Sequence, residues 1–271
     1  MADIELKHHD VGASEPTVVL IHGFSSGPED WAEQAEHLSA RHRVISVALR
    51  GHGISDRGAA PMSMEQLATD CLEILSDKGI TNAILAGHSM GTRVAIEAHR
   101  QAPDVVKGLI LMDGSNATSQ SDLETALAGF ESTVAELGYA GFAKMLFAQM
   151  FYDAKHDALK ERYIERALKV PEDVGTPLYK NLITWDGTVT SDALQAAKIP
   201  ILVVQSTTRD AKGGRRALEP GEIGAYESFV LKHAAHADVV GMPGLGHYTM
   251  IEAPAEVNQA IDAWLDQHSL R

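Results

Sequence analysis

Apolar residues recur along this chain in short, continuous runs. The run at residues 17–21, Thr-Val-Val-Leu-Ile, is almost wholly apolar and rich in β-branched side chains. This pattern is typical of a strand that is buried on both faces of a parallel sheet. Five more runs have the same character, at residues 44–49, 83–86, 105–112, 201–204 and 237–240.

Segments with helical spacing lie between these runs. In residues 64–75 the apolar side chains recur three and four positions apart, which predicts an amphipathic helix. Residues 28–39, 91–102 and 255–265 have similar patterns. Strands and helices that alternate in this way form right-handed βαβ units. The chain is therefore predicted to be an α/β protein with a mostly parallel, doubly wound central sheet.

One long stretch interrupts this alternation. No buried strand is predicted between about residues 116 and 192, where helical patterns occupy 122–137, 141–168 and 177–184. We therefore expect a helical insertion before the last two strands. The predicted division is residues 1–115 for the first part of the core, 116–192 for the insertion and 193–271 for the second part of the core.

Composition and charge exclude several classes of protein. The 271 residues include 23 Lys and Arg against 37 Asp and Glu, a formal charge of −14, so we expect neither a nucleic-acid partner nor an anionic membrane. No apolar run approaches the roughly 18 residues of a spanning helix, and the first ten residues lack a signal-peptide core. The single cysteine, Cys71, is expected in the core and cannot form an internal disulfide. These features predict a cytoplasmic protein. The sequence leaves open whether it is a monomer or a homodimer.

The strongest chemical motif is Gly87-His88-Ser89-Met90-Gly91. It follows a predicted strand and begins a predicted helix, so Ser89 would lie on a sharp turn that only small residues two positions away allow. Such a turn presents the hydroxyl above the carboxyl edge of the sheet. We interpret Ser89 as a nucleophile. The alternative is an ordinary helix N-cap.

Two further segments lie at ends of predicted strands. His22-Gly23-Phe24 ends the first strand, where Gly23 lets the Phe24 amide turn inward; with the Met90 amide it would form an oxyanion hole. His247 lies in the loop between the last strand and the last helix, on the same sheet edge as Ser89, and is the expected base. His22, Gly23 and Tyr248 are expected beside the substrate.

Together these motifs resemble the α/β-hydrolase superfamily. The matching segments are His22-Gly23-Phe24, Trp31, the stretch at 50–56, the Ser89 turn, and Gly246-His247 with Glu252-Ala253-Pro254. The resemblance implies the α/β-hydrolase fold, a helical cap formed by the insertion, and a Ser-His-Asp triad that needs no metal or organic cofactor. Three features depart from the family pattern: Ala48 replaces an aspartate, Thr92 replaces a glycine, and no strand is predicted before residue 17.

The resemblance leaves the triad acid open. In most members the acid follows the strand after the cap, where this chain has Arg209 at the usual position and Asp210 one residue later. Other members take it from the end of the strand before the cap, which here is Asp113. Asp113 is our first choice and Asp210 the alternative, with Ser206 limited to a supporting hydrogen bond.

The expected reaction is hydrolysis of a small to medium ester with an apolar part, through an acyl-enzyme. The pocket between cap and sheet is expected to be lined in part by Phe147, Phe151 and Trp185. Four arginines are expected to be solvated rather than to meet an acidic group: Arg93, Arg209, Arg215 and Arg216.

Three other reactions use the same site: carbon–carbon bond hydrolysis, lactone opening and cofactor-free perhydrolysis. His88 disfavours carbon–carbon bond hydrolysis, because enzymes with that activity usually have a similar turn with Asn at the position of His88. A non-catalytic ligand-binding protein is the alternative of a different class.

Overall fold

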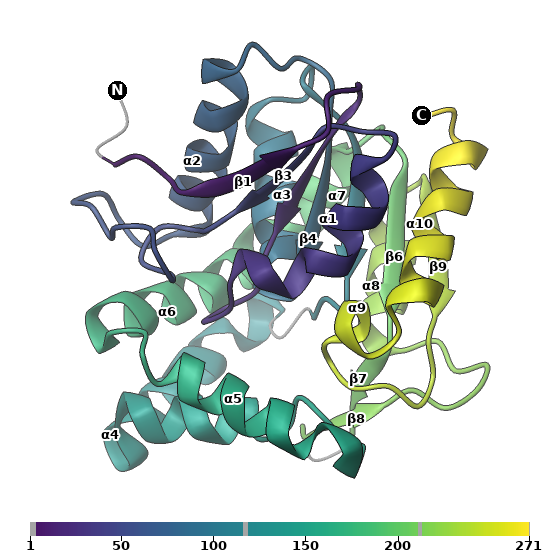
Figure 1. Cartoon of the computed structure of the whole chain (residues 1–271). Helices are drawn as coiled ribbons and strands as arrows, with labels where there is room; N and C mark the ends of the chain where they lie inside the picture. Colours follow the sequence, from purple (N-terminus) through teal and green to yellow (C-terminus); the bar gives the residue numbers. More distant parts are fainter. Residues whose placement is uncertain (1–3, 116–118, 211–212, 271) are drawn as a thin grey trace.

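A seven-stranded sheet forms the centre of the computed structural model, which describes residues 4–115, 119–210 and 213–270 (Figure 1). Its order is β1-β3-β2-β4-β5-β6-β9, and every neighbouring pair is parallel except β1 with β3. This confirms the predicted, mostly parallel α/β sheet. The strands are β1 (His8–Val11), β2 (Thr17–Ile21), β3 (Val44–Val47), β4 (Ala83–His88), β5 (Val106–Met112), β6 (Ile201–Gln205) and β9 (Ala237–Gly241).

Helices cover both faces of the sheet. On one face α1 packs with α10, the pair that lies in front of the sheet in Figure 1, and on the other α2 packs with α3. Because both faces are covered, every residue of β2 and β4 is buried, which explains their continuous apolar sequence. These helices are α1 (Ala32–Ser39, preceded by the 3₁₀ turn Pro28–Trp31), α2 (Met64–Asp77), α3 (Met90–Gln101), α8 (Ala225–His233) and α10 (Pro254–Gln267, preceded by the short α9, Thr249–Glu252).

The stretch between β5 and β6 is helical, as its sequence pattern predicts. Figure 1 shows α4, α5 and α6 gathered at one end of the sheet. Gly138, at φ 69°, interrupts α4 near the predicted break, whereas the predicted helix at 141–168 is divided between α4 and α5. The predicted boundary at residue 192 falls inside α7, and residues 116–118 lie outside the described residues. The helices are α4 (Leu123–Phe147), α5 (Asp157–Ala167), α6 (Glu172–Thr188) and α7 (Thr190–Ala196), with 3₁₀ turns at Gln120–Asp122 and Ala154–His156.

A buried ion pair joins α3 to α6. Arg93 Nε and Nη2 donate to the two carboxylate oxygens of Asp186, both at 2.7 Å, and the two side chains are only 3% and 1% exposed. One turn further along α3, Glu97 accepts the indole N–H of Trp185 at 3.1 Å. These contacts fix the position of α6 relative to the sheet.

Breaking this ion pair is expected to destabilise the protein strongly. Asp186→Ala leaves the Arg93 guanidinium buried without its carboxylate, which costs about 3–5 kcal/mol in comparable buried pairs. Urea unfolding measures the change in the free energy of unfolding. Asp192→Ala on α7 is the control, because Asp192 is exposed and its removal should cost about 0.5 kcal/mol or less. Equal losses in the two variants would contradict the prediction.

Candidate active site

Ser89 occupies a strained turn between β4 and α3. Its backbone lies at φ 53° and ψ −113°, a conformation that non-glycine residues rarely adopt outside functional sites. A Cβ atom on Gly87 would collide with the carbonyl of Gly91, and one on Gly91 would collide with the carbonyl of Ile21. Both glycines are therefore required for the chain to pass so closely, as the sequence motif predicts.

Two buried backbone amides flank Ser89. Phe24 follows Gly23 at the end of β2, and Met90 is the first residue of α3. Within the described ranges, neither amide donates a hydrogen bond to another protein group. Buried N–H groups without a partner are rare. Two of them beside a serine hydroxyl are suited to hold a negatively charged oxygen.

The structure brings His247 and Asp113 together. His247 lies in the loop between β9 and α9, and its Nδ1 is 2.8 Å from Asp113 Oδ2. Both side chains are almost wholly buried. Asp113 directly follows β5, which is the neighbour of β4, and it also has a positive φ of 42°. Ser89 and His247 line the same cavity.

The Asp113 carboxylate accepts several further hydrogen bonds. The Thr207 N–H and hydroxyl donate to it at 3.1 and 3.0 Å, and the Ser206 hydroxyl donates at 3.1 Å. Burial raises the pKa of Asp113, and the charge of Arg215 together with the Thr207 hydrogen bonds opposes that shift. Ser206 thus donates the supporting hydrogen bond that was expected of it. Thr207, which was not predicted at the site, donates from both its N–H and its hydroxyl.

The alternative acid lies elsewhere. Asp210 is exposed, in the turn of a two-stranded hairpin formed by β7 (Thr207–Arg209) and β8 (Arg215–Ala217). Its carboxylate accepts the backbone N–H of Gly214 at 2.9 Å. The structure therefore places Asp113, and not Asp210, against the imidazole of His247.

The surroundings of His247 lower the pKa of its ring. Burial lowers its pKa well below the ordinary 6.5, and the positive charges of Arg215, Arg209 and Arg93 lower it further. His88 supports the same loop, because its Nε2 donates to the His247 carbonyl at 2.8 Å and its ring lies 4.7 Å from the His247 ring. This role of His88 was not predicted from the sequence, although its position beside Ser89 was a signal.

The cavity beside Ser89 is narrow. Its volume is about 40 Å³, which leaves room for roughly one water molecule. Three of the residues expected at the pocket line it: Gly23, Phe147 and Tyr248. Leu146 and Met150 from the α4 region and Tyr179 and Leu182 from α6 complete its apolar wall.

The other three residues expected at the pocket do not line this cavity. His22 Nε2 accepts the backbone N–H of Leu49 at 3.0 Å, so its ring fixes a neighbouring loop. Phe151 stacks on Tyr248 with the ring centres 5.2 Å apart, but is not among the residues that line the cavity. Trp185 is buried against α3 through its indole hydrogen bond. Helical spacing alone did not distinguish the cavity wall from the layer behind it.

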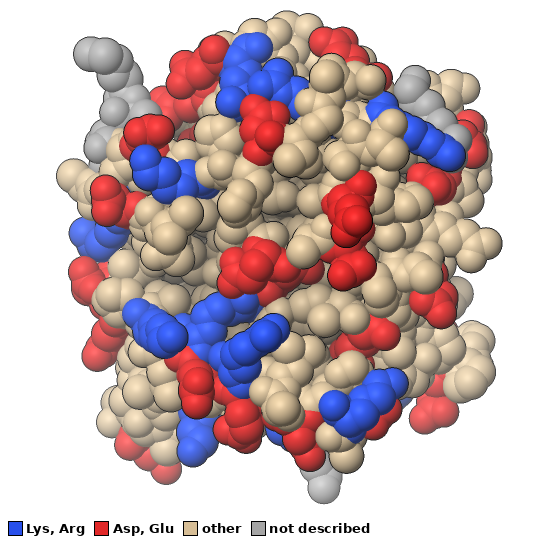
Figure 2. All heavy atoms as spheres, in the orientation of Figure 1, with Lys and Arg blue, Asp and Glu red and all other residues tan. Residues whose placement is uncertain are grey.

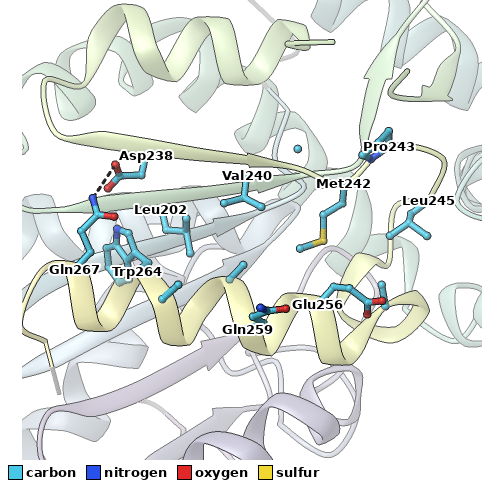
Figure 3. A pocket seen from close by; sticks show the side chains of 14 residues that line it. Leu202, Asp238, Val240, Met242, Pro243, Leu245, Glu256, Gln259, Trp264 and Gln267 are labelled. Carbon is cyan, nitrogen blue, oxygen red and sulfur yellow. Dashed lines mark hydrogen bonds between the residues drawn. The ribbon is translucent and has the colours of Figure 1, made fainter. Parts of the chain in front are cut away.

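A larger groove lies on a different part of the molecule. It has a volume of about 620 Å³ and runs between β9 and α10, with Val240, Met242 and Trp264 on its walls (Figure 3). None of Ser89, His247 and Asp113 contributes to it. The reactive side chains therefore identify the smaller cavity as the candidate active site.

Comparisons with known proteins match most of this chain. A family model described as "Alpha/beta hydrolase family" matches residues 18–260. The (E)-2-((N-methylformamido)methylene)succinate hydrolase of Acinetobacter baylyi is 25% identical over 260 residues, which cover 96% of this chain and 93% of that protein.

Solved structures show the same fold. A thermophilic esterase from Thermogutta terrifontis, with malate bound, superposes with a TM-score of 0.79 and 26% identity, covering 98% of this chain and 94% of that one. An enol-lactonase from Burkholderia xenovorans LB400 superposes with a TM-score of 0.77 and 20% identity, covering 97% of each chain, and is similar in fold alone. Within the described ranges, no helix is both long and apolar enough to cross a membrane.

Proposed function

The chain belongs to the alpha/beta hydrolase family, and from this premise we propose that it is a serine hydrolase that cleaves carboxylic esters through an acyl-enzyme. The observation that carries the proposal is the contact between His247 Nδ1 and Asp113 Oδ2 beside the strained Ser89 turn. The similarity to the Thermogutta terrifontis esterase supports the choice of bond.

In the first step Ser89 Oγ attacks the ester carbonyl while His247 Nε2 accepts its proton. Asp113 holds the Nδ1 proton, which fixes the tautomer and stabilises the imidazolium. The Phe24 and Met90 amides receive the negative oxygen. The tetrahedral intermediate then expels the alcohol, which takes the proton from His247. In the second step His247 activates a water molecule that releases the acid and restores Ser89.

We also propose that α4, α5 and α6 act as a cap over this site. Phe147 from α4 and Tyr179 and Leu182 from α6 line the cavity, whereas Ser89 and His247 belong to the sheet side. Since about 40 Å³ cannot hold an ester, substrate must displace side chains of this wall on entry. The substrate on this proposal is a small molecule whose apolar part contacts these side chains.

The type of bond can be tested directly. We expect short p-nitrophenyl esters to be hydrolysed and a fluorophosphonate probe to label Ser89 stoichiometrically, as located by peptide mass spectrometry. Labelling without turnover of any ester would point to a carbon–carbon, lactone or peracid reaction at the same serine. A folded protein that is not labelled would favour a non-catalytic ligand-binding role.

The pH dependence of turnover follows from the pKa of His247. The base works only while its ring is neutral, and activity is lost as the pH falls through its pKa. Because burial and the nearby arginines lower that pKa, kcat/KM for a neutral ester should stay on its plateau below pH 6.5. A profile measured from roughly pH 4 to 9 checks this. A midpoint of the acid limb at or above 6.5 would contradict it.

A further inference from the structure

The charge of the cavity is opposite to that of the chain. Three arginines line it, Arg93, Arg209 and Arg215, and none of its described lining residues is an aspartate or glutamate. The whole chain carries a formal charge of −14, and acidic and basic side chains are interspersed on the face shown in Figure 2. The cavity lining is therefore positive in an acidic chain. The carboxylates of Asp113 and Asp186 contact lining residues but do not themselves line the cavity.

One of the three arginines is neutralised within the protein. Arg93 forms the buried pair with Asp186 described above. Arg215 instead donates from Nη1 to the Thr207 hydroxyl at 2.7 Å, and Arg209 donates from Nη1 to the Gly213 carbonyl at 2.7 Å. These acceptors are uncharged, and among the described residues neither arginine forms an ion pair with a carboxylate.

The two arginines also oppose each other across the β7–β8 hairpin. Arg209 pairs directly with Arg215 in the strand register, an arrangement of like charges that destabilises a sheet. The neighbouring Arg216 points to the other face of the hairpin, as strand alternation requires, and forms an ion pair with Glu222. Glu222 thus pairs with the arginine that faces away from the cavity, whereas the two that line it form no ion pair in the described part of the chain. The buried Asp113 carboxylate attracts Arg215 from nearby, but without a direct contact between the two side chains.

The contact between Arg215 and His247 does not occupy the N–H donors of Arg215. Arg215 Nη1 lies 3.0 Å from His247 Nδ1. In the proposed mechanism that nitrogen carries the proton held by Asp113, so it cannot also accept a hydrogen bond from Arg215. Arg209 is exposed and lines the cavity, so it stands where the cavity meets solvent. Together they offer planar donor groups beside the reacting atoms.

We propose that Arg209 and Arg215 bind a carboxylate carried by the substrate, so that the natural substrate is an acidic ester and not a wholly apolar one. This inference rests on the proposed function and specifies its substrate class. A guanidinium matches a carboxylate with two parallel N–H donors, and a bound carboxylate would remove the repulsion between the two arginines. Arg209 and Arg215 are then recognition residues, in contrast to the expectation that they are solvated.

The test compares acidic esters with neutral esters of the same length. Mono-p-nitrophenyl succinate, glutarate and adipate are each paired with the unsubstituted p-nitrophenyl ester of equal chain length, and 4-acetoxybenzoate is paired with its methyl ester to place the charge on the alcohol side. For at least one pair, we expect wild-type protein to have the higher kcat/KM for the acidic member, mainly through a lower KM.

Removing an arginine should abolish this preference. In Arg209→Gln and in Arg215→Gln the ratio of acidic to neutral kcat/KM should fall roughly ten- to hundredfold, the range of a lost charge-assisted hydrogen bond. Arg216→Gln is the matched control, since it removes one positive charge from the same hairpin but on the opposite face, and its ratio should equal that of the wild type.

Two outcomes separate this inference from the proposed function. If esters are hydrolysed but no pair shows a preference that depends on Arg209, the carboxylate subsite is refuted and the serine hydrolase remains. A readout without turnover covers the converse case: glutarate should raise the Tm of both wild type and Ser89→Ala, but not of Arg209→Gln, and glutaramide should have no effect. If none of the free dicarboxylates succinate, glutarate and adipate stabilises wild type or Ser89→Ala, the inference fails, whatever bond the enzyme cleaves.

Discussion

Replacing Ser89 with alanine is expected to lower kcat for any hydrolysed ester by roughly 10⁴- to 10⁶-fold, the loss found when a serine nucleophile is removed. In the proposed mechanism the hydroxyl is the group that forms the acyl-enzyme, and Ser89 lines the same cavity as His247. The fluorophosphonate adduct should disappear as well. Stopped assays with a reactive p-nitrophenyl ester measure the first effect, and intact-protein mass measures the second.

The fold should survive this substitution. Alanine keeps a Cβ atom at the positive φ of 53°, so the strain of the turn is neither relieved nor increased. Ser228→Ala, on the exposed side of α8, is the control for the loss of a serine hydroxyl and should retain full turnover. Substantial ester hydrolysis by a folded Ser89→Ala protein would refute Ser89 as the nucleophile.

The central sheet was predictable because burial leaves a clear signal in the sequence. A strand covered by helices on both faces must be apolar at nearly every position, and β2 begins and ends where its apolar run does. The glycines around Ser89 were predictable for a similar reason, since close backbone contact excludes any larger residue. Both signals are local, and each comes from a single steric or solvation requirement.

Elements without such a requirement were missed. β1 is an edge strand with the sequence His-His-Asp-Val, mostly exposed, and its backbone pairs antiparallel with β3. β7 and β8 have three residues each and are rich in polar side chains, so they resemble a loop. The hairpin nevertheless supplies Thr207, Arg209 and Arg215 to the candidate site.

The identity of the acid shows the limit of sequence spacing. Asp113 and Asp210 both follow a predicted strand at the same sheet edge, so position in the chain does not choose between them. The choice depends on where each loop turns after its strand. Asp113 turns back at a positive φ toward His247, whereas the chain after β6 continues into the hairpin and carries Asp210 out to solvent.

Replacing Asp113 with asparagine is expected to lower kcat about 10⁴-fold, because asparagine would select the wrong tautomer of His247. The backbone N–H groups of Thr207 and Ser206 donate to Oδ1 at 3.1 and 3.3 Å, so the amide oxygen of asparagine would take that place. Its NH₂ group would then occupy the position of Oδ2, 2.8 Å from Nδ1, and donate to it. The remaining proton of the ring would lie on Nε2, which could no longer accept the Ser89 proton.

Asp210→Asn is the matched test, because it makes the same chemical change at the alternative acid. Its side chain is exposed and its contact is with the Gly214 amide, so kcat should stay close to that of the wild type. Ester turnover together with NMR of the imidazole nitrogens distinguishes the two variants: only Asp113→Asn should move the proton from Nδ1 to Nε2. If Asp210→Asn loses turnover while Asp113→Asn keeps it, the acid of the site is Asp210, and the contact between Asp113 and His247 has only a structural role.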